Sequence, residues 1–243
     1  MKFSAEDLFL VSGASSGIGK QAVLDIIKYG GRVVACARSM DKLLQLQQEC
    51  TYPERLFIEQ KDFSKNIGDL PRWLKEISVK YGKLRGMVCA AGTARINPVR
   101  SIDVEEIRNL FDINYFAPVF MVKGFADFRV HMPGNCSVVM VASASAERSD
   151  KGHAEYAGSK AALIASAISI GRELAEKMIR VNCISPSNVR TPLTEAAGEE
   201  YLQAQALAYP LGIGSVEDVS NMILFLLSEK SKWITCQNYT IDC

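Results

Sequence analysis

Short apolar runs alternate along the chain with longer stretches in which apolar residues recur at helical spacing. Continuous apolar runs fit strands covered on both faces of a parallel sheet, whereas apolar residues at i, i+3 and i+4 indicate amphipathic helices. The predicted strands are Leu8–Ser12, Arg32–Ala37, Arg55–Glu59, Gly86–Ala90, Ser137–Ala142, Arg180–Ile184 and Asn238–Ile241. The predicted helices include Gly17–Tyr29, Asp41–Cys50, Leu70–Tyr81, Val104–Val130 and Tyr156–Lys177. This alternation predicts an α/β protein whose doubly wound parallel sheet carries helices on both faces.

The alternation continues through most of the 243 residues without an internal repeat or a Gly/Ser/Pro-rich linker. We therefore expect one domain spanning residues 1–243. The segment Ser187–Ser215 departs from the pattern and is too long for a plain connection. Connections of this length are usually functional, so we expect a lid over a binding site at about residues 187–215.

The charge balance excludes several classes of protein. The chain has 28 basic and 27 acidic residues and is 48% hydrophobic, which is too apolar for a disordered protein and gives no basic excess for nucleic acid. No apolar run approaches the roughly 18 residues of a membrane span. Glu6 and Asp7 stand where a signal peptide would become apolar, so we expect no nucleic-acid partner, membrane contact or leader.

The seven cysteines are scattered, odd in number and without a C-x-x-C pair, and the histidines are His131 and His153. This pattern predicts neither a disulfide framework nor a metal site. Several cysteines lie within apolar runs, where the residue is usually a small buried hydrophobe. We expect a reducing, cytoplasmic compartment.

The first predicted strand runs into a glycine-rich turn at which a helix begins. Its spacing is G-x-x-x-G-x-G, and such a turn also occurs as simple punctuation. After the first strand of an α/β sheet, however, glycines let a pyrophosphate approach the free N–H groups of the helix N-terminus. The candidate phosphate-binding residues are Gly13, Ser15, Ser16, Gly17, Ile18 and Gly19.

The second predicted strand ends at Ala37-Arg38. Dinucleotide-binding folds commonly place an acidic residue near this point to hold the adenosine ribose, and Ala37 occupies that position here. Arg38 is suited to pair with a 2′-phosphate through charge-assisted hydrogen bonds, which favours NADP(H) over NAD(H). The alternative is that Arg38 is a solvated charge at a strand end.

Tyr156 and Lys160 begin a long predicted helix and share one helical face. A free tyrosine titrates near pH 10, and a neighbouring cation lowers that value and makes the hydroxyl a usable acid or base. A lone Y-x-x-x-K is a weak signal. Here Ser143 ends the fifth predicted strand, at the edge where α/β sheets bind ligands.

Together these motifs resemble the short-chain dehydrogenase/reductase family, in its compact single-domain form, which includes 3-oxoacyl thioester reductases and related carbonyl reductases. The resemblance covers essentially the whole chain. The motifs that carry it are Gly13/Gly17/Gly19, Ala90-Ala91-Gly92, Asn114, Ser143, Tyr156/Lys160 and the segment 182–192. It implies a Rossmann-like fold of about seven strands. It also implies an NADP(H)-dependent oxidoreductase that transfers a hydride between nicotinamide and a carbonyl or secondary alcohol.

The resemblance implies a role for each catalytic residue. Tyr156 is the acid/base, Lys160 lowers its pKa and binds the nicotinamide ribose, and Ser143 binds the substrate oxygen. Asn114 carries a water that links Lys160 to solvent, although a structural helix amide is the alternative. Asp62 follows the third strand where the family has an acid facing adenine, and a loop cap is the alternative there. Further implied cofactor contacts are Ala90, Ala91, Gly92, Pro186, Val189 and Thr191.

The chain also departs from the family pattern. Cys89-Ala90-Ala91-Gly92 lacks the usual paired asparagines, Ser187 stands where a glycine usually follows Pro186, and Cys236 and Cys243 replace C-terminal glycines. The lid is rich in Ala and Leu, so we expect an amphipathic helix whose apolar side chains cover a largely apolar carbonyl or alcohol.

Two further expectations concern activity and assembly. The rival function is a non-catalytic NADP(H) sensor or scaffold on the same fold, because fold alone does not separate the two. The predicted helix Val104–Val130 carries more large apolar residues than one sheet-facing stripe needs, Phe116 and Phe120 among them, and small residues such as Ala161 and Ala165 would let the predicted helix Tyr156–Lys177 approach a partner helix closely. The family pairs these helices at a two-fold seam and often uses the C-terminal strand, so we expect a homodimer or homotetramer.

Overall fold

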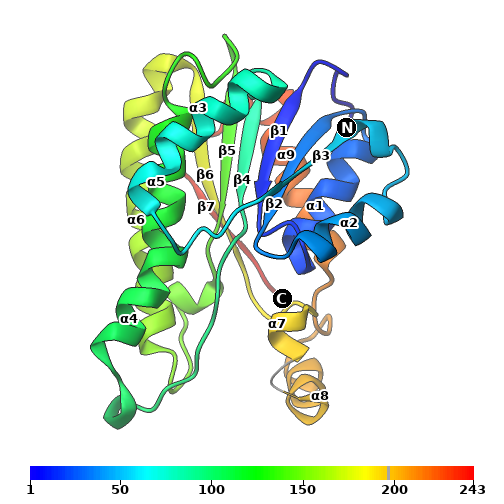
Figure 1. Cartoon of the computed structure of the whole chain (residues 1–243). Helices are drawn as coiled ribbons and strands as arrows, with labels where there is room; N and C mark the ends of the chain where they lie inside the picture. Colours follow the sequence, from blue (N-terminus) through cyan, green and yellow to red (C-terminus); the bar gives the residue numbers. More distant parts are fainter. Residues whose placement is uncertain (196–197) are drawn as a thin grey trace.

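The computed structural model describes residues 1–195 and 198–243 and contains a seven-stranded sheet in the order β3-β2-β1-β4-β5-β6-β7 (Figure 1). All of its paired strands run parallel. The strands are β1 (Leu8–Ser12), β2 (Arg32–Ala37), β3 (Leu56–Gln60), β4 (Gly86–Cys89), β5 (Cys136–Val141), β6 (Ile179–Pro186) and β7 (Asn238–Ile241). The strand order reverses between β1 and β4, which opens a crevice at the carboxyl ends of these strands. The predicted fold class is confirmed.

Helices cover both faces of the sheet (Figure 1). One face packs against α1, α2 and α9, and the other against α3, α5 and α6. Of the helices in the described part of the chain, none has the length and apolar character needed to cross a bilayer. The helices are α1 (Gly17–Lys28), α2 (Met40–Glu49), α3 (Leu70–Tyr81), α4 (Val104–Phe111), α5 (Ala117–Phe125), α6 (Ala154–Leu174), α7 (Pro192–Glu195), α8 (Glu199–Ala208) and α9 (Val216–Leu227).

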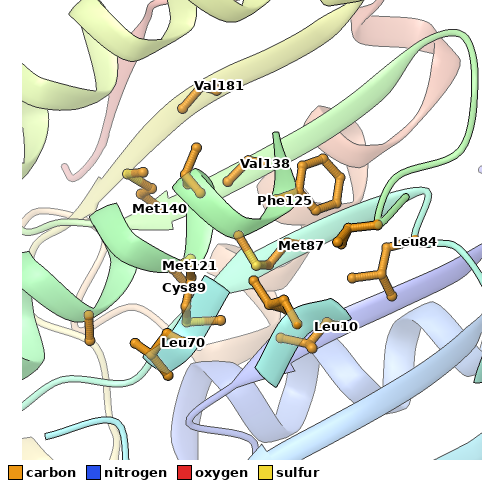
Figure 2. Packing of buried hydrophobic residues seen from close by; sticks show 14 of the residues in the cluster. Leu10, Leu70, Leu84, Met87, Cys89, Met121, Phe125, Val138, Met140 and Val181 are labelled. Atoms are coloured by element: carbon orange, nitrogen blue, oxygen red, sulfur yellow. The ribbon is translucent and has the colours of Figure 1, made fainter. Parts of the chain in front are cut away.

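The inner strands β1, β2, β4 and β5 are apolar at most positions because both of their faces are buried, whereas the edge strands β3 and β7 are partly exposed. Successive side chains point to opposite faces, so Leu10 joins the cluster under α3, α5 and α6 while Val11 joins the one under α1 and α9. Figure 2 shows the first cluster, in which Met87 and Val138 of neighbouring strands lie close to Phe125 of α5. Burying one such side chain contributes about 1.5–3 kcal/mol to folding.

The predicted bounds of β1, β2 and β7 match the structure, and the other strands shift by a residue or two. The predicted helix Val104–Val130 is wrong as a single element. It consists of α4, a π-helical turn over Asp112–Phe116 and α5, and it ends at Phe125. Val130 is apolar because it is buried in a turn against the core, not because it continues the helix.

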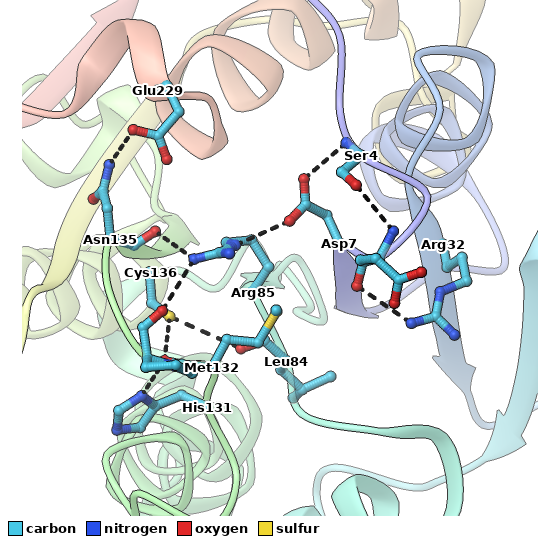
Figure 3. Close-up of polar contacts among 12 residues, drawn as sticks. Ser4, Asp7, Arg32, Leu84, Arg85, His131, Met132, Asn135, Cys136 and Glu229 are labelled. Atoms are coloured by element: carbon cyan, nitrogen blue, oxygen red, sulfur yellow. Dashed lines mark hydrogen bonds and ion pairs between the residues drawn. The ribbon is translucent and has the colours of Figure 1, made fainter.

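A polar network ties the amino ends of three strands together, at the opposite end of the sheet from the crevice. The Arg85 guanidinium donates from Nε to Asp7 Oδ1 at 3.0 Å and from Nη1 to the backbone oxygen of Asn135 at 3.4 Å (Figure 3). Asp7 precedes β1, Arg85 precedes β4 and Asn135 precedes β5. Arg85 therefore fixes the spacing of strands whose carboxyl ends form the crevice.

Replacing Arg85 with Met is expected to lower the free energy of unfolding by about 1–3 kcal/mol, because Asp7 and a backbone oxygen lose their charged donor. Urea denaturation measures the change. The control is Arg72→Met, which removes an ion pair with Glu76 whose side chains are 84% and 61% exposed. Such a pair contributes little, about 0.5 kcal/mol or less. Equal effects of the two substitutions would contradict the assigned role of Arg85.

Candidate active site

A cleft of about 440 Å³ lies at the carboxyl ends of the strands. It brings together residues that are far apart in the sequence. Nearly all of the sequence-predicted site residues line it: Gly13, Ser15, Ser16, Gly17, Ile18, Gly19, Arg38, Ala90, Ala91, Gly92, Ser143, Tyr156, Lys160, Pro186, Val189 and Thr191. Asp62 and Asn114 are predicted site residues that do not line it.

The glycine-rich turn between β1 and α1 passes so close to neighbouring backbone that Gly13 and Gly19 leave no room for a Cβ atom. Gly13 has a φ of +70°, and a Cβ there would lie 2.7 Å from the Ala91 backbone nitrogen. A Cβ on Gly19 would lie 2.4 Å from the Gly13 carbonyl oxygen. Ser16 is the N-cap of α1, yet its side chain caps no backbone N–H. The first-turn amides therefore face the cleft without a side-chain partner, which fits an anionic group.

Arg38 is exposed at the end of β2 and lines the cleft. Its backbone oxygen accepts a hydrogen bond from Gln60 Nε2 at 2.8 Å, which fixes the strand end and leaves the guanidinium projecting. Asp62 is held locally, because its Oδ1 accepts from the Ser64 backbone N at 3.0 Å and Oγ at 2.7 Å. Burial raises the pKa of Asp62, but these bonds outweigh it and the pKa is lowered. This arrangement corresponds to the loop-cap alternative, and Phe63 lines the cleft instead.

The segment after β4 is held in place without the paired asparagines of the family pattern. The Ala91 backbone N donates to Ser12 Oγ at 3.2 Å. Asn114 Oδ1 accepts from the Thr93 backbone N and Asn114 Nδ2 donates to the Thr93 backbone oxygen, both at 2.9 Å. Asn114 Nδ2 also donates to Ser159 Oγ at 3.1 Å. The Asn114 side chain is thus a buried clamp between the π-helical turn, the β4 loop and α6.

Ser143, Tyr156 and Lys160 meet on one wall of the cleft. Ser143 follows β5, and its Oγ accepts from the Ser145 backbone N at 3.2 Å, which leaves its own O–H free to donate. Tyr156 and Lys160 lie one turn apart on α6, as the i, i+4 spacing predicts. Lys160 Nζ donates to the Val141 backbone oxygen at 2.8 Å and lies 5.9 Å from the centre of the Tyr156 ring.

Burial dominates the electrostatics of this wall. It raises the pKa of Tyr156, and the Ser143 hydroxyl opposes that rise. It lowers the pKa of Lys160 to about 8, which the thiols of Cys183 and Cys89 offset only in part. In this structure burial of the Tyr156 hydroxyl outweighs the effect of any neighbouring charge on its pKa, because desolvation penalises the phenolate while the Lys160 ammonium binds a backbone oxygen and lies over the ring.

The segment after β6 forms the opposite wall, where Pro186, Val189 and Thr191 lie. A Cβ on Gly17 would lie 3.3 Å from the Thr191 side chain, so this segment closes against the glycine-rich turn. Thr194 Oγ1 donates to the Val189 backbone oxygen at 2.7 Å and fixes the turn before α7.

The predicted lid contains α7 and α8, and residues 196–197 of it lie outside the described residues. Its apolar side chains do not all face the cleft: Leu207 is 90% and Leu211 87% exposed. Instead, α8 and the residue after it turn Gln205 and Tyr209 toward Asn188 and Ser187.

Sequence reasoning missed several residues that line the cleft: Phe63, Thr93, Ile113, Leu193 and Thr194. Most follow a predicted motif by one or two positions, and no spacing rule marks them. Thr93 could have been found from its position in the sequence, because it follows the Ala90-Ala91-Gly92 motif directly and lies four residues after the end of β4 at Cys89.

Comparison with known proteins identifies the family of the chain. The family model described as enoyl-(acyl carrier protein) reductase matches residues 13–243. The 3-oxoacyl-(acyl-carrier-protein) reductase FabG of Thermotoga maritima is 29% identical over 96% of this chain and 95% of that protein. The D-erythrulose reductase of Gallus gallus is 30% identical over 96% and 93%. A solved short-chain type dehydrogenase/reductase from Mycobacterium ulcerans superposes with a TM-score of 0.90 at 29% identity, covering 100% of this chain and 90% of that one. The chain belongs to the short-chain dehydrogenase/reductase family of oxidoreductases.

Proposed function

We propose that this oxidoreductase is a single catalytic domain that uses NADP(H) to reduce a carbonyl to a secondary alcohol. The observation that carries the proposal is the meeting of Ser143, Tyr156 and Lys160 on the wall of a cleft that begins at the glycine-rich turn. D-Erythrulose reductase and L-xylulose reductase of Caenorhabditis elegans are among its relatives, each 30% identical, and their names denote reduction of carbonyl compounds.

The residues present fit a nicotinamide dinucleotide. The Gly13–Gly19 turn offers uncapped amides and backbone that a Cβ would obstruct, which suits a pyrophosphate. Arg38 would hold the 2′-phosphate, Ala90 to Gly92 would lie along the middle of the cofactor, and Val189 and Thr191 would hold the nicotinamide. A bound reduced nicotinamide supplies the hydride that adds to the carbonyl carbon.

The chain itself supplies the proton. The Ser143 hydroxyl donates a hydrogen bond to the substrate oxygen and orients it, while the Tyr156 hydroxyl gives that oxygen its proton as the C–H bond forms. The raised pKa of Tyr156 keeps the hydroxyl protonated at neutral pH, which favours reduction. The Lys160 ammonium then stabilises the phenolate and, with Asn114 and its backbone partners nearby, lies on the route by which the proton returns from solvent.

The substrate end of the cleft holds both apolar and hydroxyl-bearing side chains. Ile113 and Leu193 support the expectation of an apolar substrate portion, and the hydroxyl-bearing Thr93 and Ser187 also line the cleft. A reducing, cytoplasmic setting remains part of the proposal, supported by seven free thiols of which five are buried.

Following NADPH oxidation against a panel of ketones, hydroxyketones and thioesters tests the proposal. We expect turnover of at least one class. Tight NADPH binding without turnover of any carbonyl, or of any alcohol with NADP⁺, would instead favour the sensor or scaffold.

Replacing Arg38 with Ala is expected to weaken NADPH binding about 10- to 100-fold and NADH binding about twofold or less, because only the 2′-phosphate loses a charged partner. Calorimetric titration of both cofactors measures the difference. Arg55→Ala, at the amino end of β3, is the matched control and is expected to change neither. If the wild type binds both cofactors equally well, Arg38 is only a surface charge.

We also propose that the protein is a homodimer or homotetramer. Phe116, which joins the π-helical turn to α5, is 42% exposed, and the small residues Ala161 and Ala165 are exposed on α6. A large apolar side chain next to a flat helix face suits close packing of a second copy.

Replacing Phe116 with Glu is expected to shift the light-scattering mass at micromolar concentration to that of a monomer. Leu44→Glu on α2, at a site 45% exposed on the other face of the sheet, is the control and is expected to leave the mass unchanged. A wild type that stays monomeric with NADPH bound would overturn the proposal.

A further inference from the structure

One tyrosine hydroxyl and one serine hydroxyl join the proposed lid to the loop after β6, which lines the cleft. Tyr209 follows α8, and its hydroxyl lies 2.8 Å from Ser187 Oγ, one residue past β6. Asn188 Nδ2 donates to the Tyr209 hydroxyl at 3.3 Å and to Gln205 Oε1 of α8 at 2.7 Å. We define these four residues, Ser187, Asn188, Gln205 and Tyr209, as the latch.

The two halves of the latch are anchored very differently. The Ser187 backbone N donates to the Ile241 oxygen of β7 at 3.0 Å, and the Asn188 oxygen accepts from the Gly214 backbone N at 3.0 Å. The loop half is therefore tied into the sheet. The lid half has Leu202 buried, but Leu207 and Leu211 are almost fully exposed.

A segment with few buried apolar side chains opens at a lower free-energy cost than the core does. The polar contacts to Ser187 and Asn188 therefore contribute a large share of the free energy that holds α8 against the loop after β6. Of these, the Ser187–Tyr209 contact is the one that reaches the cleft, because Ser187 is a lining residue. The Ser187 hydroxyl contacts Tyr209, so the same hydrogen bond determines the position of the lid and the orientation of a side chain on the cleft wall.

We propose that Tyr209 is a positioning residue and that its hydroxyl contact with Ser187 sets how much of the time the lid is closed. The expected effect on catalysis rests on the proposed function, whereas the effect of the contact on lid opening does not. With the latch formed, the lid, whose α7 residues Leu193 and Thr194 line the cleft, restricts exit of cofactor and substrate. With it broken, the cleft opens to solvent. The serine that replaces the family's usual glycine thereby acquires a role, since glycine offers no hydroxyl to Tyr209.

Hydrogen exchange of the protein without ligand tests the structural content. In Tyr209→Phe and in Ser187→Ala, amides of residues 199–214 are expected to exchange about three- to tenfold faster, the effect of one neutral hydrogen bond. Tyr209→Phe also removes the bond from Asn188 Nδ2, so the double variant is expected to exchange no faster than Tyr209→Phe alone, because both single variants remove the Ser187–Tyr209 bond. Ser187→Thr keeps the hydroxyl and is expected to restore slow exchange. Tyr52→Phe, on the exposed surface, is the matched control.

The catalytic consequence is measured separately on any carbonyl that the wild type reduces. We expect Tyr209→Phe to raise KM and the rate of NADP⁺ release about three- to tenfold, with kcat not lowered and the melting temperature unchanged. Unchanged exchange in both single variants, or additive effects in the double variant, would overturn the latch. Faster exchange without any carbonyl turnover would leave the latch standing and count against the proposed function alone.

Discussion

Replacing Tyr156 with Phe is expected to lower kcat about 10²- to 10⁴-fold, the usual contribution of a positioned general acid. The phenyl ring keeps the packing on α6 and removes only the proton that the carbonyl oxygen needs. Steady-state kinetics with any carbonyl that the wild type reduces measures the loss. Binding of NADPH, followed by its fluorescence, is expected to stay within about threefold of the wild-type value, because a neutral hydrogen bond contributes little to affinity.

Tyr115→Phe is the matched control for this substitution. Its hydroxyl lies 3.1 Å from Ser166 Oγ, between α6 and the π-helical turn and away from the cleft lining. Loss of that hydroxyl is expected to affect stability slightly and kcat not at all. Turnover that persists undiminished in Tyr156→Phe would remove Tyr156 from the proposed mechanism and leave Ser143 or a water as the proton donor.

The glycine-rich turn was predictable from the sequence for a physical reason. Only glycine fits positions where a Cβ would meet backbone at 2.4 to 2.8 Å, as at Gly13 and Gly19, so the requirement is visible in residue type alone. The same holds for Tyr156 and Lys160, because helical periodicity places i and i+4 on one face whatever the tertiary structure. Local sequence rules were therefore enough to predict that the glycine-rich turn and the Tyr156–Lys160 pair belong to the cleft.

Asn114 and Asp62 show where local rules stop. Each is a polar residue at a position that matches a family motif. In the structure the Asn114 side chain is hydrogen-bonded to the backbone of Thr93, and the Asp62 side chain accepts from the backbone of Ser64. The identity of those partners depends on where the π-helical turn and the β3 loop lie in space. The sequence leaves a structural alternative open for both residues, and the assembled loops show the hydrogen bonds on which that alternative depends.

The length of the segment 187–215 predicts a lid, but its composition does not predict which way its side chains point. Composition predicted apolar side chains over the substrate, whereas Leu207 and Leu211 point outward and Tyr209 turns inward. Which side of α8 faces the loop after β6 depends on contacts with Ser187 and Asn188, of which Ser187 lines the cleft. A pattern within one segment does not contain that information.

The second large effect concerns Lys160, whose burial is costly to the fold. Its side chain is buried beside the cleft, and the pKa falls from the ordinary value of 10.5 to about 8. Between these values the unfolded chain holds a proton that the folded protein has released, so stability rises with pH in this range. Below pH 8 the full cost is present, about 3 kcal/mol at roughly 1.4 kcal/mol per pKa unit.

Replacing Lys160 with Met is therefore expected to stabilise the protein while lowering kcat at least about 100-fold, since the phenolate of Tyr156 loses its cation. Leaving the Val141 oxygen without its donor costs about 1–2 kcal/mol, so the net gain near pH 7 is about 1–2 kcal/mol. Urea denaturation at pH 7 and at pH 10 measures it, and the gain is expected to shrink at the higher pH. Lys42→Met, at an exposed lysine of α2, is the control for general charge effects. A Lys160→Met variant that is less stable than the wild type at pH 7 would show that burial of Lys160 does not destabilise the fold. The same conclusion would follow if the free energy of unfolding changed by the same amount at pH 7 and pH 10.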